Sequence, residues 1–290
     1  MKASIIIRCK DEAAHIGQVL DGVFSQEGGI PFEVLVIDSG STDSTLHIVS
    51  RYDCDVTCIP PEEFGYGYTM NLGAKKAAGD ILVFLSAHCP PVNNGWLKTL
   101  LAPFDDPSVA GTFGRQTPVK GLNPFDEWRL ARAFPEKGGR LQEHMFSSAN
   151  AAVRKSVWEA LPFDESLPFS EDRLWAREAA KFGHRITYVP KASVRHGHAF
   201  SLPGVYRRAY AAGWAKKKIY GDICRFDSRA WIAGAYLYCI IADALHFIDG
   251  GHWNFLKYIG YYRRLELSGF YDGARDSGKG IYRPRVERRK

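Results

Sequence analysis

The sequence predicts an α/β fold built on a mostly parallel sheet, and three observations support this prediction. Short apolar runs alternate with helix-like segments as far as about residue 105. Three of these runs end in polar clusters, and the carboxyl ends of strands are where open parallel sheets bind ligands. The chain has 290 residues, 46% of them hydrophobic, enough for a large core and an appendage. We therefore expect one sheet with helices on both faces.

The first two strands lead into polar turns. Residues Ala3–Arg8 form an apolar run, and CKDEAAHI after it enters a helix. The segment Phe32–Asp43, FEVLVIDSGSTD, combines an apolar strand, a carboxylate at the strand's carboxyl end and a turn in which Gly40 permits a tight bend. Asp38 is therefore predicted to point into a crevice, where a nucleobase or ribose could bind it. The alternative is that Asp38 only organises its own turn.

The next elements follow in chain order. A third strand, DILVFLSAH, covers Asp80–His88. Beyond it, Gly111–Pro124 is predicted to be a strand and loop, and Phe125–Gln142 a polar helix or flexible loop. Ser147–Val153 leads to a short helix, and Glu171–Phe182 is a helix with two acids in its first turn. Two short strands, RITYVP and ASVRH, close a first domain of residues 1–200.

Residues 201–290 form a second predicted domain, which is basic, aromatic and helical. They hold 17 Lys and Arg residues against 8 Asp and Glu, whereas residues 1–200 hold 21 against 24. The run Trp231–Ile248 suits attachment to an anionic membrane surface. A helical hairpin packed on the first domain and a contact in a homodimer are the alternatives. A full membrane span is disfavoured, because Asp243 and His246 would be costly in hydrocarbon.

The start of the chain and its cysteines indicate the compartment. Met1 opens almost directly into the first strand and no signal peptide is recognisable, so we expect a cytoplasmic protein, peripheral on the inner face of the cytoplasmic membrane if residues 201–290 bind lipid. The six cysteines lack the paired spacing of zinc sites, apart from Cys54 and Cys58, and are interpreted as reduced thiols. No nucleic-acid partner is expected.

Four ordered motifs give the chain a likeness to a known family. They are SIIIRCKDEAAHI (Ser4–Ile16), VIDSGSTDST (Val36–Thr45), MNLGAKKAAGDILVFLSAH (Met70–His88) and FSEDRLWARE (Phe169–Glu178). Over about residues 1–200 the chain resembles the family 2 glycosyltransferases, which are inverting sugar-nucleotide enzymes of GT-A fold. The pattern HGHAFSL…YRRAYAAG is similar to their rhamnosyltransferase branch. The resemblance implies transfer of a sugar from a dTDP- or UDP-sugar to a hydroxyl of a glycan or lipid-linked acceptor, in polysaccharide biosynthesis.

The FSED motif supplies the catalytic residues that the resemblance implies. In an inverting single displacement, a carboxylate must accept the proton of the attacking hydroxyl. Asp172 matches the family's base, and Glu171 is expected to orient the acceptor and to repel Asp172, which raises the proton affinity of one of the pair. The alternative is that both acids only stabilise the dipole of their helix.

The triplet Ser86-Ala87-His88 departs from the family's pattern. Relatives usually carry Asp-x-Asp here, and the last acid binds the divalent cation, Mn²⁺ or Mg²⁺, that holds the donor diphosphate. A histidine adds no negative charge and favours softer ions than Mg²⁺. His196 and His198 occupy the place where the family often supplies a further metal ligand. We therefore expect His88, His196 and His198 to contribute cation ligands, the alternative being ordinary surface or core histidines.

Donor contacts are implied less directly. The resemblance places residues of the first strand's loop around the nucleobase, with Asp38 on the base or ribose, and a segment after residue 70 near the diphosphate. The donor-binding residues predicted in this way are Arg8, Lys10, Asp11, Asp38, Asn71, Lys75, Arg115 and Arg207. The cations among them would offset phosphate charge.

Two other function classes remain open from the sequence. A sugar-nucleotide nucleotidyltransferase has a related α/β layout, but RCKDEA stands where such an enzyme has a Gly-rich G-x-G-T-R-type loop. A non-catalytic carbohydrate-binding protein could keep the fold after losing the Asp-x-Asp triplet.

Overall fold

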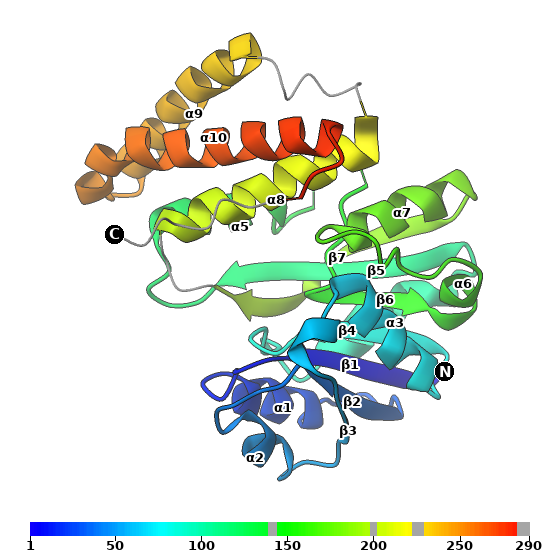
Figure 1. Cartoon of the computed structure of the whole chain (residues 1–290). Helices are drawn as coiled ribbons and strands as arrows, with labels where there is room; N and C mark the ends of the chain where they lie inside the picture. Colours follow the sequence, from blue (N-terminus) through cyan, green and yellow to red (C-terminus); the bar gives the residue numbers. More distant parts are fainter. Residues whose placement is uncertain (139–143, 198–201, 222–228, 283–290) are drawn as a thin grey trace. The chain divides into compact units, whose positions relative to one another are not determined.

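The computed structural model describes residues 1–138, 144–197, 202–221 and 229–282 (Figure 1). The chain divides into two compact units. The first, called here the sheet unit, comprises Met1–Gly121, Glu127–Leu167 and Glu171–Gly197. The second, the helical unit, comprises Leu122–Asp126, Pro168–Ser170 and His198–Lys290.

The sheet unit is organised around a seven-stranded sheet of order β3-β2-β1-β4-β6-β5-β7. The strands are β1 (Ala3–Cys9), β2 (Phe32–Asp38), β3 (Asp55–Cys58), β4 (Ile81–Ser86), β5 (Val109–Pro118), β6 (Asn150–Arg154) and β7 (Arg185–His196). Neighbouring strands are parallel except at β6, which runs antiparallel to both β4 and β5. The predicted α/β fold with a mostly parallel sheet is confirmed.

Two strand predictions need correction. The third strand ends at Ser86, so Ala87 and His88 lie in the turn that follows it instead of in the strand. RITYVP and ASVRH belong to one strand, β7, not two. The pairing of β7 with β5 shifts register between Gly114 and Gln116, where the partner residue changes from Val189 to Val194. This register shift accommodates Pro190, the residue that made RITYVP and ASVRH look like two separate strands in the sequence.

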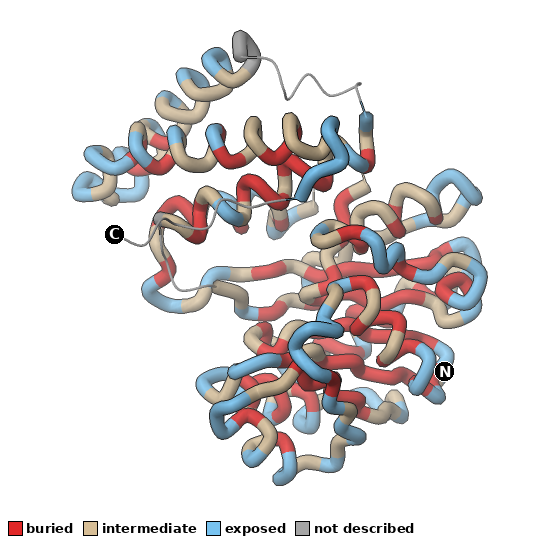
Figure 2. Tube along the Cα trace, viewed as in Figure 1, coloured by how far each residue is buried: buried red, intermediate tan, exposed pale blue. Residues whose placement is uncertain are grey.

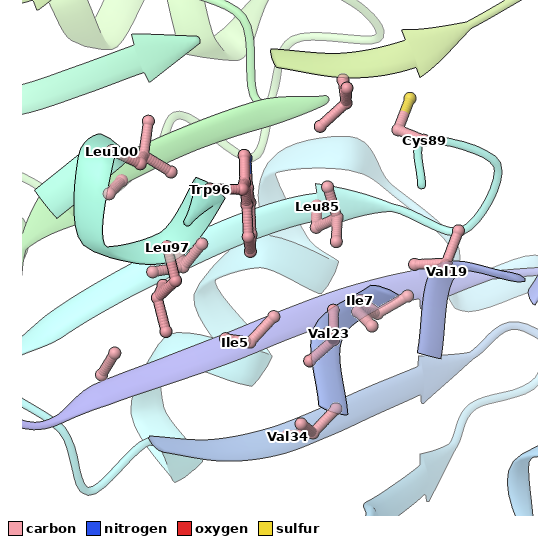
Figure 3. Close-up of a cluster of buried hydrophobic side chains, with 14 of the residues drawn as sticks. Ile5, Ile7, Val19, Val23, Val34, Leu85, Cys89, Trp96, Leu97 and Leu100 are labelled. Atoms are coloured by element: carbon pink, nitrogen blue, oxygen red, sulfur yellow. The ribbon is translucent and has the colours of Figure 1, made fainter. Parts of the chain in front are cut away.

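The helices of the sheet unit pack on the sheet through their apolar side chains. In the sheet unit they are α1 (Ile16–Phe24), α2 (Thr45–Val49), α3 (Tyr66–Lys76), α4 (Trp96–Leu101), α6 (Lys155–Ala160) and α7 (Glu171–Lys181), with 3₁₀ turns at Pro61–Glu63 and Ala102–Asp105; α5 (Pro124–Ala133) continues from one unit into the other. Figure 3 shows side chains of α1 and α4 packing on β1, β2 and β4. This apolar layer is close-packed, so it gives the loops at the strand ends a rigid base.

A buried tryptophan ties this core to the loop before β6. Trp96 is fully buried, and its indole N–H donates a hydrogen bond to Asn150 Oδ1 at 2.9 Å. Asn150 Nδ2 in turn donates to the carbonyl oxygen of Ala192 in β7 at 2.9 Å. These bonds satisfy a buried indole and a buried amide. They also fix the start of β6, which matters because Ser147 and Ser148 immediately precede it.

The helical unit consists of α8 (Leu202–Tyr220), α9 (Arg229–Asp249), a 3₁₀ turn η4 (Trp253–Tyr258) and α10 (Ile259–Gly278). Helix α10 packs along α8 (Figure 1). A Cβ at Gly269 or Gly273 would overlap the carbonyl oxygen of Tyr206 or Tyr210, so only glycine allows this close approach. The predicted run Trp231–Ile248 lies within α9.

Helix α9 has an unusual distribution of exposure. Its segment Ile232–Asp249 is long and apolar enough to cross a membrane by length and composition, with a mean hydropathy of 1.4. Only 11% of this segment is buried, unlike a core helix of a soluble protein. Figure 2 shows α9 mostly in the colours of intermediate and exposed residues.

Candidate active site

The loops that follow β1 and β2 are hydrogen-bonded to each other at the carboxyl edge of the sheet. The N–H of Thr42 donates to Asp11 Oδ1 at 2.7 Å, and the N–H of Asp11 donates to Ser41 Oγ at 2.9 Å. Asp11 takes a positive φ of 51°, a conformation that aspartate tolerates better than most residues. Lys10 and Asp11 are both exposed. The two loops therefore form one polar rim whose charged side chains face solvent.

Asp38 lies beneath this rim and is 1% exposed. Its Oδ2 accepts hydrogen bonds from the N–H groups of Gly40 and Ser41, at 3.0 and 2.9 Å. Its Oδ1 accepts bonds from the Ser41 hydroxyl and the Cys9 thiol, at 2.5 and 3.4 Å. Burial raises the pKa of that thiol, and the Asp38 charge raises it further. The geometry of Asp38 thus matches the turn-organising role that the sequence left open.

A cluster of possible cation ligands lies at the end of β4 and β7. The ligand atoms of His88, Cys89 and His196 lie within 4.8 Å of one another. The two imidazole rings are stacked, with centroids 5.3 Å apart. The structure therefore brings together His88 and His196, as predicted, although β4 and β7 are not neighbours in the sheet. The third predicted ligand, His198, lies outside the described residues.

Each imidazole in the cluster is oriented by a side chain from another loop or strand. His88 Nδ1 is 2.8 Å from Glu12 Oε1, and His196 Nδ1 is 2.6 Å from Gln116 Oε1. Because a carboxylate and an amide oxygen accept hydrogen bonds, both histidines donate through Nδ1. Nε2 is then the nitrogen that would bind a cation on each ring, the arrangement by which metal-binding histidines are usually held.

The donor set can be tested against a divalent cation. Burial raises the pKa of the Cys89 thiol, with a smaller contribution from Glu12, which disfavours Cys89 as a ligand. The two imidazoles would then supply the ligands, and an imidazole ligand brings no negative charge. Such a set fits a cation softer than Mg²⁺ that takes its remaining ligands from an anionic substrate. The residues therefore fit a manganese-type site completed by a diphosphate.

A second cluster surrounds the acidic pair at the start of α7. Asp172 Oδ2 accepts the N–H of Ser148 at 2.9 Å, and Oδ1 accepts the N–H of Arg173 at 2.7 Å. Arg8, at the end of β1, donates to Ser148 Oγ at 3.3 Å and lies 4.0 Å from Glu171 Oε1. The structure thus brings together Arg8, Glu171 and Asp172, three of the predicted site residues.

The two acids differ in their surroundings. Glu171 is 3% exposed, whereas Asp172 is partly exposed. Burial raises the pKa of Glu171 to about 8, the nearby Asp172 charge raises it too, and Arg8 opposes both effects. Glu171 is therefore the acid of the pair that binds a proton more readily. Asp172 is more exposed, and backbone N–H groups orient its carboxylate, a geometry that suits a base.

The two clusters meet at Ser147 and Ser148. Ser147 Oγ accepts a hydrogen bond from Gln116 Nε2 at 2.8 Å, and the same Gln116 orients His196. The next residue, Ser148, holds Asp172 through its backbone N–H. One dipeptide is thus bonded to Asp172 and, through Gln116, to His196.

Two further predicted site residues, Asn71 and Lys75, lie on α3. Asn71 is 3% exposed; its Nδ2 donates to Phe163 O and Glu165 Oε1, and its Oδ1 accepts from Trp158 Nε1 and Phe163 N. All four of its hydrogen-bonding positions are used, so the predicted diphosphate contact of Asn71 is not supported by its geometry. Lys75 is exposed at the end of α3.

Two predicted arginines have different surroundings. Arg115 Nη1 lies 3.4 Å from Glu136 Oε2, within the sheet unit. Arg207 is exposed on α8, in the helical unit. Their predicted contacts with the diphosphate stay predictions.

Several residues of these clusters were missed by the sequence reading. The sequence offered a signal for Cys89 as a cluster member, since this residue directly follows His88. It offered a weaker signal for Glu12, which lies in the acidic loop after the first strand. Gln116 and Ser148 had none, because their partners lie 80 and 24 residues away along the chain.

The comparisons with known proteins agree with this geometry. The family model described as "Glycosyl transferase family 2" matches residues 4–161. The O-antigen chain rhamnosyltransferase WbaN of Salmonella anatum is 32% identical over 202 residues, which cover 66% of this chain and 64% of that protein. The O-antigen chain rhamnosyltransferase RfbN of Salmonella typhimurium is 30% identical over 227 residues, covering 73% and 72%.

A solved structure supports the fold over almost the whole chain. The mannosyltransferase PcManGT from Pyrobaculum calidifontis, in complex with GDP-Man and Mn²⁺, has a TM-score of 0.65. It is 20% identical, and the match covers 97% of this chain and 88% of that one. The GT-A fold predicted from the four motifs is confirmed.

Proposed function

The chain belongs to glycosyl transferase family 2, and we propose that it transfers rhamnose from a dTDP-linked donor to a hydroxyl of a glycan or lipid-linked acceptor. The proposal rests on the sequence identity between this chain and two O-antigen chain rhamnosyltransferases. This identity is 30% or more over about two thirds of the chain or more. A UDP-sugar is the alternative donor. Polysaccharide biosynthesis at the inner face of the cytoplasmic membrane is the setting that this acceptor implies.

Asp172 is the proposed base of an inverting single displacement. The acceptor hydroxyl attacks the anomeric carbon opposite the nucleoside diphosphate, and Asp172 takes the hydroxyl proton as the new bond forms. Backbone N–H groups of Ser148 and Arg173 fix the carboxylate. Burial raises the pKa of Glu171, so its proposed role is to donate a hydrogen bond to the acceptor or to Asp172 rather than to compete for the hydroxyl proton.

His88 and His196 are the proposed cation ligands, and Glu12 and Gln116 keep their rings in place. A divalent cation bound there would offset the charge of the departing diphosphate. The PcManGT structure is a complex with GDP-Man and Mn²⁺, which supports a divalent cation of this kind.

The donor nucleotide is proposed to contact the polar rim formed by the loops after β1 and β2. Lys10 and Asp11 face solvent there, whereas Asp38 beneath them holds the turn in shape. Arg115 and Lys75 are proposed to contribute positive charge near the diphosphate. Residues 1–200 are the proposed catalytic domain and residues 201–290 a separate helical domain.

The test is a donor screen on the full chain. Purified protein is incubated with dTDP-rhamnose, UDP-glucose, UDP-N-acetylglucosamine and GDP-mannose, each with Mn²⁺, Mg²⁺ or chelator, and release of nucleoside diphosphate is measured. We expect dTDP release from dTDP-rhamnose, fastest with Mn²⁺. Release of pyrophosphate from a sugar phosphate and nucleoside triphosphate would support a nucleotidyltransferase instead, and binding of sugar nucleotides without turnover would support a non-catalytic protein.

The base is tested separately by Asp172→Asn. The amide cannot accept the proton, so transfer should fall by at least about a hundredfold, while binding of free dTDP is retained. Asp105→Asn, an exposed acid in the 3₁₀ turn after α4, is the matched control and should leave transfer unchanged. Near wild-type transfer by Asp172→Asn would show that another group removes the proton.

A further inference from the structure

Helix α9 of the helical unit presents large apolar side chains to the outside as well as packing Ile240, Ala244 and Phe247 inward. From residue 232 to the end of α9, the exposed large apolar side chains are Leu237, Tyr238, Ile241, Leu245 and Ile248. Leu237, Tyr238 and Leu245 are 62%, 64% and 60% exposed. Spacings of three and four residues put the set on one side of the helix, over about three turns. We call these five residues the apolar face of α9.

One of the two acids of α9, Asp243, lies on the inward side, whereas Asp249, the last residue of the helix, is exposed. Asp243 is 1% exposed and forms a two-pronged ion pair with Arg263 of α10, with Nε–Oδ2 and Nη2–Oδ1 distances of 2.6 and 2.7 Å. Phe247 is fully buried against Phe125, one turn further along. A helix that buries the carboxylate in its middle turns and presents leucine and isoleucine outward is expected where the outer side meets an apolar medium.

The residues that follow α9 indicate what this medium is. Trp253, Tyr258 and Tyr261 are 60%, 48% and 54% exposed, and they lie in η4 and the first turn of α10. Lys257 and Arg264 are exposed among them, and Lys257 Nζ lies 5.1 Å from the centroid of the Tyr258 ring. Tryptophan and tyrosine favour the level of lipid headgroups, and lysine and arginine are attracted to anionic headgroups.

We propose that the apolar face of α9, together with Trp253, Lys257 and Arg264, docks the protein onto the surface of an anionic lipid bilayer. The charge distribution disfavours a second copy as the occupant, because a two-fold contact through this face would bring the same cations together. The ion pair disfavours a crossing helix. The partner of Asp243 is on α10, so α9 could cross the bilayer only by breaking the pair or by taking a charged second helix with it. The proposal does not depend on which sugar is transferred.

The experiment is co-sedimentation of the full chain with vesicles. We expect binding to vesicles of phosphatidylcholine and phosphatidylglycerol at three to one, and at least about tenfold weaker binding to phosphatidylcholine alone or in 0.5 M salt, because screening weakens the attraction of exposed cations. Bound protein should be released by carbonate at high pH. No binding to anionic vesicles would overturn the proposal, and resistance to carbonate would replace surface docking by insertion across the bilayer.

Variants assign the binding to the surface named. The triple change Leu237→Ser, Ile241→Ser, Leu245→Ser alters exposed positions only and should lower the partition coefficient at least about tenfold while leaving the melting temperature and donor hydrolysis unchanged. Phe182→Ser, a 72% exposed phenylalanine of the sheet unit, is the matched control and should bind vesicles like wild type. Lys257→Glu with Arg264→Glu should remove the preference for anionic lipid.

The same variants decide between lipid and a second copy. If light scattering shows a dimer that the triple serine variant dissociates, and vesicle binding is the same for both proteins, the face is a dimer contact and the proposal is wrong. A wild-type protein whose oligomeric state is unaffected by the triple variant, with lipid binding lost, supports it.

Discussion

Replacing Glu171 by glutamine should change how stability depends on pH. The folded protein holds this carboxyl at a pKa of about 8, against an ordinary value of 4.5, mainly because it is buried. A raised pKa means that the group's stabilising contribution is fully present below pH about 4.5 and is lost as the pH rises towards 8. Glu171→Gln keeps the shape and has no proton to lose, so it should not show this loss.

The magnitude follows from the interval between the two pKa values. Each pH unit costs somewhat more than about 1 kcal/mol, which gives an upper bound of about 5 kcal/mol for the whole interval. Water entry and side-chain relaxation around an ionised carboxylate reduce such penalties. We therefore expect Glu171→Gln to exceed wild type in unfolding free energy by about 1 to 3 kcal/mol at pH 8.5, and by much less at pH 5.

The assay is urea unfolding at half-unit intervals from pH 5 to 9, followed by tryptophan fluorescence. The informative quantity is the difference in unfolding free energy between variant and wild type at each pH, because other titrating groups cancel in it. Glu159→Gln, an exposed acid on α6, is the control and should show a constant difference. A constant difference for Glu171→Gln would refute the reasoning and mean that Glu171 is already ionised at pH 5 and stabilised by Arg8.

Three further outcomes are expected. Asn71→Ala should lower the unfolding free energy by about 2 to 4 kcal/mol, because it leaves buried groups around Phe163 and Trp158 without partners, whereas Lys75→Ala should change it by less than about 0.5 kcal/mol; equal effects in thermal unfolding would contradict the structural role of Asn71. Asp38→Ala should cost about 1 to 3 kcal/mol through the N–H groups of Gly40 and Ser41, and an unchanged melting temperature would count against the turn-organising role. His88→Ala should abolish the Mn²⁺-dependent part of dTDP binding in calorimetry and His88→Asp should restore it with a shift towards Mg²⁺, whereas full Mn²⁺ dependence in His88→Ala would place the cation elsewhere.

The sequence predicted the strands near the site well because they are buried on both faces. Continuous apolar runs such as those in β1, β2 and β4 have few other interpretations in a chain of this length. The antiparallel direction of β6 could not be predicted in the same way, since strand direction leaves no mark on a five-residue apolar run. The join of RITYVP and ASVRH into one strand was hidden by a proline that the register shift in β7 accommodates.

The candidate site was predictable where residues follow a strand and not where they depend on distant partners. His88 and Asp172 stand in motifs, so their positions could be named. Asn71 lies on a helix, and its side chain points to Phe163 and Trp158, which are 92 and 87 residues further along the chain. The side chain of Gln116 is hydrogen-bonded to His196 and Ser147, which are 80 and 31 residues further along the chain. No local pattern records contacts of this kind, because they arise from packing of elements that are far apart in the sequence.

The shared anchoring of Asp172 and His196 by Ser147 and Ser148 has a consequence for how such an enzyme can diverge. A substitution that moves this dipeptide alters the proposed proton acceptor and the proposed cation site in one step, so its effect on activity depends on which residues already occupy both sites. Changes in ligand type at position 88 or 196 should therefore show epistasis with changes at 147 and 148. Stepwise replacements at positions 88, 147, 148 and 196 are therefore expected to keep the protein active when they are made in some orders and to inactivate it when they are made in others.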